Sequence, residues 1–269
     1  MTSRLEPTLL VYTGLFFAAQ TLPVAAQAAP EATFEVVTIR PTPPATTNWR
    51  NEFIPGRMRF ENRSVRDMIK YAYNLPSDSQ VVGATGWIVS DHFDMVGTED
   101  EELAQKLQTL PSPERSALMH ELVKGVLRDR YGLQVQQKKV VLPVLALVPA
   151  HDGPKVTATN PSDGRTFFGI VGPTGSLHAR ATSMNNLADR LTGIPEADGR
   201  LIVDRTGLPG KYDWTLRWSA GSMETATGET EPLPPLFTAL QEQLGLRLVP
   251  QKAEVDAILI EHVERPSAN

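Results

Sequence analysis

The alternation of apolar and polar positions predicts short strands spread along the whole chain. β-Branched and aromatic residues are frequent in these stretches, as they are in strands that bury one face. Two of the strands, 133–137 and 141–148, are expected to form a hairpin that turns at Lys138-Lys139. Residues 42–55 are polar and rich in proline, and they predict a loop. The predicted strands cover residues 34–39, 57–60, 92–96, 133–137, 141–148, 177–180, 201–203, 212–218, 246–249 and 257–263.

Helical spacing of apolar residues, together with start and stop signals, predicts helices between these strands. Ser64, with Asp67 three residues later, is close to a capping box, and Ser183 provides a second N-cap. Two further helices are expected to end at Gly132 and Gly245, because glycine commonly follows the last helical turn. The predicted helices cover residues 64–73, 112–131, 183–191 and 235–244, and the acidic residues 98–102 fit either a loop or the start of a helix.

Several of these signals occur twice. Ser64 and Ser183 are separated by 119 positions, and each begins an amphipathic helix. The same offset separates Asp94 from Asp213, and each of these acids follows an aromatic residue. The two helix-ending glycines are 113 positions apart, so the repeats would differ by six loop residues. The pattern favours an internal duplication, with chance matches between common strand and helix starts as the alternative.

The expected fold class is therefore α+β, with two related β-α-β-β-α-β-β units. In each unit, short helices would pack on a small mixed or antiparallel sheet. The predicted organisation is a signal peptide at 1–28, a first unit at 29–150, a turn-rich joiner at 151–174 and a second unit at 175–269.

The N-terminus and the composition predict an exported protein. Arg4 supplies a basic start, residues 9–19 are apolar, and Ala26-Gln27-Ala28 is a small-x-small cleavage site. An uncleaved anchor is the alternative, but the apolar stretch is short for a span of ~20 residues. No other segment predicts a membrane span. The net charge of −5 argues against a nucleic-acid partner, and the absence of cysteine excludes thiolate chemistry.

Few residues suggest chemistry. The histidines lie too far apart in sequence for a local zinc pattern, and no cofactor is expected. Asp94 and Asp213 could form the carboxylate pair of a glycosidic hydrolase, or each could brace a turn. Trp87, Trp214 and Trp218 could stack on a sugar or peptide, or they could fill the core. Strand edges are the other expected interaction surface, since a partner strand can pair with them.

The chain resembles the soil-associated, acidobacterial family of secreted proteins, a domain family of unknown function. The resemblance implies export from a bacterial cell, and fusions of similar domains to membrane metallopeptidases and thioredoxin-like proteins suggest sensing or docking. The family implies no catalytic residues. The segments that carry the resemblance are residues 34–41, 127–133, 142–148, 203–214, 236–246 and 262–267.

The expected function is thus a non-enzymatic binding or sensing module that docks an envelope protein, a peptide or a glycan. The alternative is a hydrolase of the cell wall or of a polysaccharide that uses Asp94 and Asp213. The expected location is the periplasm or the outside of the cell.

Overall fold

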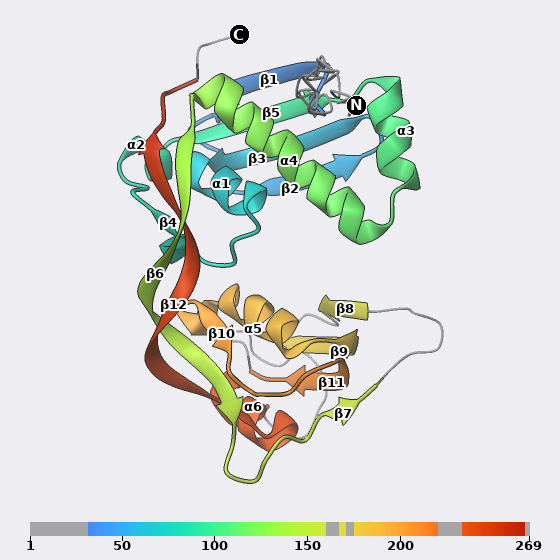
Figure 1. The fold of residues 1–269 in the computed structure, drawn as a ribbon, viewed down its shortest axis with the longest axis vertical. Coiled ribbons are helices and arrows are strands. Elements are labelled where there is room, and N and C mark those ends of the chain that lie inside the picture. Colours follow the sequence, from blue (N-terminus) through green and yellow to red (C-terminus); the bar gives the residue numbers. More distant parts are fainter. Residues whose placement is uncertain (1–31, 160–166, 171–174, 220–232, 267–269) are drawn as a thin grey trace, which may run out of the picture. The chain divides into compact units, whose positions relative to one another are not determined.

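Three small sheets and the helices between them make up the fold (Figure 1). The structure is a computed structural model that describes residues 32–159, 167–170, 175–219 and 233–266. Each sheet has four strands, so the fold is mixed α+β, as the sequence predicts. The predicted signal peptide lies outside the described residues.

The first sheet has the strand order β1-β5-β3-β2, and every neighbouring pair is antiparallel. Helices α1 and α4 cover one face of it, and Figure 1 shows α4 crossing that face. Phe60, Met95 and Leu127 are among the buried side chains between the sheet and these helices. The elements are β1 (Val36–Pro41), β2 (Arg50–Ile54), β3 (Arg57–Ser64), α1 (Val65–Ala72), α2 (Trp87–Ser90), β5 (His92–Thr98), α3 (Glu101–Thr109) and α4 (Ser112–Tyr131).

Strand β2 corrects the prediction of a polar loop over residues 42–55. Its five residues pair with β3 in regular register, from Arg50 opposite Glu61 to Ile54 opposite Arg57. Pro55-Gly56 forms the tight turn between the strands, and Gly56 has φ 84°. The prediction was wrong because the strand is short and half polar, and because proline on both sides obscured its alternation.

Capping bonds confirm the predicted N-termini of α1 and α5, and left-handed glycines confirm the predicted C-termini of α4 and α6. The Ser64 hydroxyl oxygen accepts a hydrogen bond from the Asp67 N–H at 3.1 Å, and the Asp67 carboxylate accepts one from the Ser64 N–H at 3.2 Å. The Ser183 oxygen caps α5 (Met184–Thr192) in the same way, through the N–H of the third helical residue. Helices α4 and α6 (Leu236–Leu244) end at Gly132 and Gly245, both in the left-handed conformation.

The second sheet is built on a long two-stranded ribbon and corrects the predicted hairpin at Lys138-Lys139. β6 (Gln134–Pro149) is a single strand, and β12 (Leu246–His262) pairs with it antiparallel along nearly its whole length. A two-residue hairpin turn needs positive φ angles. Among the described residues, none between Gly132 and Gly153 has one. Two short strands flank the ribbon. β10 (Ile202–Asp204) pairs parallel with β6, and β4 (Val81–Val82) pairs parallel with β12.

The third sheet has the order β7-β11-β9-β8 and belongs to the C-terminal part of the chain. Helices α5 and α6 share a core with it that includes Leu187, Leu216 and Leu240. Its strands are β7 (Thr157–Ala158), β8 (Phe167–Ile170), β9 (Ser176–Thr182) and β11 (Tyr212–Arg217), and two 3₁₀ turns elsewhere cover Asp78–Gln80 and Pro195–Ala197.

The predicted duplication is not confirmed by this arrangement. The sequence predicts four strands in the 133–148 and 246–263 regions, two for each unit, whereas the structure has only β6 and β12, which pair with each other. The duplication therefore stays a prediction, although one local feature does recur, as described below.

Candidate functional site

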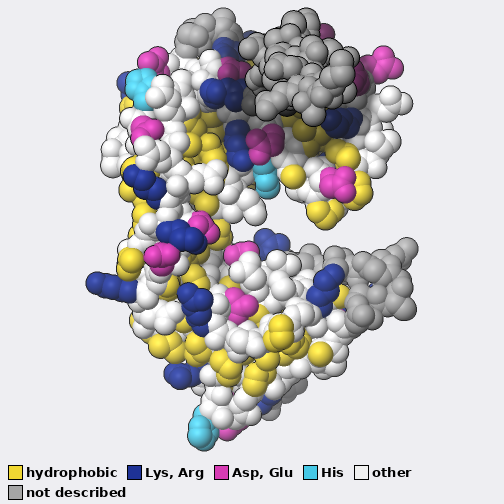
Figure 2. Space-filling model, viewed as in Figure 1, with side chains coloured by type: hydrophobic (Ala, Val, Ile, Leu, Met, Phe, Trp, Pro, Cys, Tyr) yellow, Lys and Arg dark blue, Asp and Glu magenta, His cyan; other side chains and the backbone are white. Residues whose placement is uncertain are grey.

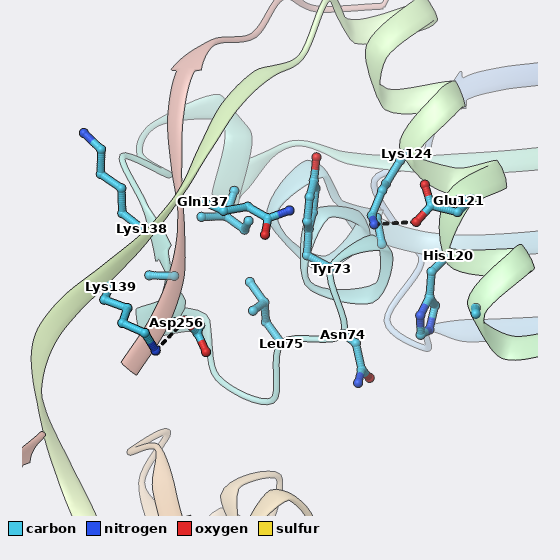
Figure 3. Close-up of a pocket in the computed structure, with 14 residues that line it drawn as sticks. Tyr73, Asn74, Leu75, His120, Glu121, Lys124, Gln137, Lys138, Lys139 and Asp256 are labelled. Carbon is cyan, nitrogen blue, oxygen red and sulfur yellow. Dashed lines mark hydrogen bonds and ion pairs between the residues drawn. The ribbon is translucent and has the colours of Figure 1, made fainter. Parts of the chain in front are cut away.

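A cavity of about 550 Å³ lies between the end of α1, the helix α4 and the β6–β12 ribbon (Figure 3). This volume is within the range of ligand-binding cavities. Apolar atoms of Leu75 and Ile258 line it together with small residues, and polar side chains surround them. The lining comprises Ala72, Tyr73, Asn74, Leu75, Ala117, His120, Glu121, Lys124, Gln137, Lys138, Lys139, Asp256, Ala257 and Ile258.

The end of α1 shapes one wall of the cavity. Asn74 takes a left-handed conformation with φ 51°, which asparagine tolerates better than most residues. The Leu75 N–H then donates to the Lys70 carbonyl at 2.8 Å, as in the closing bond of a helix C-terminus. This reversal places Leu75 among the lining residues rather than along the helix.

Four of the five charged side chains that line the cavity form two ion pairs. Lys124 Nζ lies 2.7 Å from the Glu121 carboxylate and 4.8 Å from the centre of the Tyr73 ring. Lys139 Nζ lies 3.0 Å from the Asp256 carboxylate, and this hydrogen bond raises the pKa of Lys139. Figure 3 shows Tyr73 standing between Lys124 and Gln137. Lys138, the fifth, makes no ion pair among the described residues, so the lining carries one net positive charge and suits a ligand with both apolar and polar groups.

A run of ring contacts connects the cavity to the edge of the first sheet. The His120 ring meets Tyr71 edge-on at 5.0 Å, and Tyr71 in turn stacks on Phe53 of β2 at 5.6 Å. Burial raises the pKa of Tyr71 to about 12. Burial, and then the Lys124 ammonium, lower the pKa of His120, while Glu121 opposes them. His120 is therefore mainly neutral at pH 7, and its half-buried ring packs against Tyr71.

Burial also raises the pKa of Tyr73, with the Glu121 carboxylate adding to the shift and Arg128 opposing it. Tyr73 thus keeps its phenolic proton and presents a neutral hydroxyl and a ring edge. Figure 2 shows basic, acidic and hydrophobic side chains intermixed on the face over which α4 runs. This mixed surface offers no single sign of charge to a ligand.

The structure places Asp94 and Asp213 in different sheets, and each carboxylate accepts a hydrogen bond from a backbone N–H of the neighbouring strand. The Asp94 carboxylate accepts from the Asn62 N–H at 2.9 Å and from the Thr42 hydroxyl at 2.8 Å. The Asp213 carboxylate accepts from the Ala181 N–H at 2.7 Å. Asn62 and Ala181 have φ angles of 53° and 54°, an unusual conformation for residues with a Cβ. The same bond therefore holds the same strained conformation twice.

The three candidate tryptophans are not brought together. Trp214 and Trp218 are only 6% and 5% exposed, and both belong to the core of the third sheet. The Trp218 indole N–H donates to Glu196 at 2.9 Å. Trp87 is half-buried at the start of α2, with Arg265 5.2 Å from the centre of its ring. Burial leaves Trp214 and Trp218 little surface for a ligand.

The described residues offer neither a candidate metal centre nor a membrane-spanning helix. These residues contain no cluster of three or more His, Asp or Glu side chains that could hold a metal ion. Across the same ranges, no helix is both long and apolar enough to cross a membrane.

The fold and the site define a mixed α+β domain with a ligand-sized cavity between its helices and a two-stranded ribbon. The chain belongs to the family described as "Protein of unknown function (DUF3738)", whose sequence pattern matches residues 66–263. This membership confirms the resemblance to a domain family of unknown function. No curated protein and no solved structure matches the chain significantly.

Sequence reasoning missed the cavity because its lining comes from four separate segments. Tyr73, His120, Gln137 and Asp256 share no motif, and only the fold brings them together. The one local signal was Asn74 after the last turn of α1, since asparagine favours left-handed helix ends.

Proposed function

We propose that this chain is an exported, non-enzymatic binding module that docks a polypeptide segment of an envelope protein. The observation that supports it is the cavity, where apolar atoms of Leu75 and Ile258 are surrounded by five charged side chains, four of them paired within the chain. Such a lining binds a mixed apolar and polar segment without leaving a buried charge unpaired. The ligand would gain contacts with Leu75, Ile258 and the Tyr73 hydroxyl.

A polypeptide fits better than the glycan that the sequence also allowed. Sugar-binding sites commonly present a flat aromatic face to solvent, which a sugar ring covers. Trp214 of β11 and Trp218, the residue that follows this strand, are buried in the core. Lys124 lies over the ring of Tyr73, the aromatic side chain in the cavity. The export itself is proposed from the predicted signal peptide and from the resemblance to a secreted family.

The hydrolase alternative would need Asp94 and Asp213 to act on one bond, with carboxyl groups about 5–10 Å apart. Each carboxylate instead accepts a hydrogen bond from a backbone N–H in its own sheet. This arrangement favours a structural role for both acids. Hydrolysis of cell-wall polymer by the mature chain, abolished by Asp94→Asn, would support the alternative.

A pair of variants on α4 tests the binding proposal. Ala117 is exposed and lines the cavity, whereas its neighbour Ser116 is exposed but does not line it. Ala117→Trp should fill the cavity, and Ser116→Trp adds the same side chain elsewhere on the same helix turn. Both proteins should unfold at the same temperature as the wild type, because neither position is buried.

The assay is capture from envelope extract by the immobilised mature chain, read by quantitative mass spectrometry. We expect one or more proteins captured by the wild type and by Ser116→Trp, and a loss of at least about tenfold with Ala117→Trp, since a blocked site forfeits more than 1.4 kcal/mol. Equal capture by both variants, or capture of none, would refute the cavity as a docking site. Cell fractionation of the native protein checks its export.

A further inference from the structure

The edge strand β2 carries a second interaction surface, separate from the residues that line the cavity. We propose that β2 accepts an extended segment of a partner protein as a fifth strand of the first sheet. The segment would alternate apolar and acidic residues. This inference does not depend on what the cavity binds.

Exposed apolar side chains are concentrated on β2 and the residue before it. Among the described residues, six large hydrophobic side chains are exposed, and three of them are Trp49, Phe53 and Ile54. Their exposed fractions are 63%, 43% and 45%. An edge strand with exposed apolar side chains is a template for association, which proteins usually suppress with charges, proline or bulges. Its retention here indicates that another strand covers it.

Four other edge strands, β1, β4, β7 and β10, lack this combination. β4 and β7 have two residues each, and β10 has three, which is too short to hold a partner strand. β1 is long enough, but it ends in Pro41 and exposes one large apolar side chain, Val36. β2 contains no proline, and its register with β3 is regular.

The main-chain groups of β2 are arranged for a further strand. In a two-residue hairpin the residues that flank the turn, here Ile54 and Arg57, form a hydrogen-bonded pair, and such pairs alternate along the strands. By this alternation the N–H and C=O groups of Asn51 and Phe53 face the free edge. An added strand would take up these groups.

The segment that precedes β2 in the chain is held in place by side-chain hydrogen bonds. The Asn62 amide donates to the carbonyls of Thr46 at 3.3 Å and Asn48 at 3.1 Å. The Asn62 backbone N–H is itself bound by Asp94. The segment before Trp49 is therefore ordered without a partner, which lowers the entropy lost on binding.

The charges around the strand select an acidic partner. Arg50, Arg57 and Arg59 share the face of the sheet opposite to the helices with Glu52 and Glu61. Arg59 pairs closely with Glu61 at 2.5 Å, but Arg50 lies 3.7 Å and 3.9 Å from its two acids and is 64% exposed. Arg57 is exposed and makes no ion pair among the described residues. Carboxylates at alternate positions of a partner strand would reach these arginines, and apolar residues on its other side would contact Phe53.

The probe is a synthetic peptide of about ten residues that alternates valine and glutamate, with a fluorescent label, and its matched control has lysine for glutamate. Binding to the full mature chain is measured by anisotropy at low salt. We expect the glutamate peptide to bind and the lysine peptide to bind at least about tenfold more weakly, because like charges would face Arg50 and Arg57. Equal binding of the two peptides, or no binding, would overturn the proposal.

A matched pair of variants separates main-chain pairing from side-chain contact. Asn51→Pro removes one outward N–H, a change that edge strands tolerate, whereas Asn51→Ala keeps that N–H. The Asn51 side-chain oxygen has no hydrogen-bond partner within the described structure, so its removal should be harmless. We expect wild-type affinity for Asn51→Ala and roughly tenfold weaker binding for Asn51→Pro. Equal affinities for the two variants would refute strand addition.

Hydrogen exchange on the wild-type chain decides the case even if Asn51→Pro does not fold. Saturating peptide should slow exchange at the Asn51 and Phe53 amides and leave those of Glu52 and Ile54 unchanged, because only the first two face the free edge. Unchanged exchange at Asn51 and Phe53 would overturn the proposal. Ala117→Trp should leave peptide binding intact, so failure at the cavity and failure at β2 are distinguishable.

Discussion

Replacing Asp94 and Asp213 by alanine, singly and together, tests whether these acids hold the backbone. Asp94→Ala removes the acceptor of the Asn62 N–H and of the Thr42 hydroxyl. Asp213→Ala removes the acceptor of the Ala181 N–H. In both cases the residue that loses its bond has a positive φ angle, which the surrounding structure must then sustain alone.

The magnitudes follow from the number of bonds lost. A hydrogen bond to a charged group contributes roughly 1.5–3 kcal/mol, and the lower end applies because both carboxylates are half-buried. Asp213→Ala should therefore lower the free energy of unfolding by about 1.5 kcal/mol, and Asp94→Ala by about 2–3 kcal/mol. The two acids lie in different sheets and share no partner, so the double variant should equal the sum within about 0.5 kcal/mol.

The assay is urea unfolding followed by circular dichroism, with Asp94→Asn and Asp213→Asn as isosteric controls. An amide oxygen still accepts the N–H but without a charge, so each control should lose about half as much as the alanine variant. A loss below about 0.5 kcal/mol in both alanine variants would show that the bonds do not brace the fold. Unchanged stability combined with abolished hydrolysis of a polymer would assign the acids to catalysis instead.

Two further predictions concern the helix ends and the cavity. Gly245→Ala should destabilise the fold by about 2–4 kcal/mol, because a Cβ would lie 1.9 Å from the Gly153 carbonyl oxygen in addition to the left-handed strain. Gly132→Ala, where a Cβ meets nothing closer than 3.8 Å, should lose only about 1 kcal/mol in the same unfolding assay, and equal losses would contradict the clash. Burial and Lys124 lower the pKa of His120 below 6.5 in the folded chain. As the pH falls, His120 is therefore protonated first in the unfolded chain. The wild type should consequently lose stability below about pH 6.5. His120→Gln should lack this part of the pH dependence. If the free energy of unfolding changes equally with pH in both proteins between about pH 7.5 and 5.5, the prediction is contradicted.

Local signals account for what the sequence predicted well. The capping box of Ser64 and Asp67 and the terminal glycines of α4 and α6 act through bonds within a few residues, so their chemistry is visible in sequence. The alternation in β5 and β11 likewise reports one buried face for each strand. These signals were enough for the fold class.

The long-range features could not be predicted in the same way. Lys138-Lys139 interrupts the apolar pattern of β6 because this part of the ribbon is exposed on both faces, which in sequence is indistinguishable from a turn. Strand partners are equally invisible, so nothing indicated that β12 would pair with β6 or that Asp256 would reach the cavity. The cavity is a product of this pairing.

Strands β3 and β9 contain the same kind of irregularity but differ there in one side chain. In both strands an aspartate of the neighbouring strand holds a residue with a positive φ angle, but that residue is Asn62 in β3 and Ala181 in β9. Only asparagine has a side chain that can continue the network, and it does so by fixing the segment that leads to Trp49. Ala181 has no polar side-chain atom, so its bond to Asp213 involves the backbone N–H alone, and the residue is buried. A shared structural device thus supports an exposed, ordered edge strand in one half alone, which is why the proposed partner surface lies on β2.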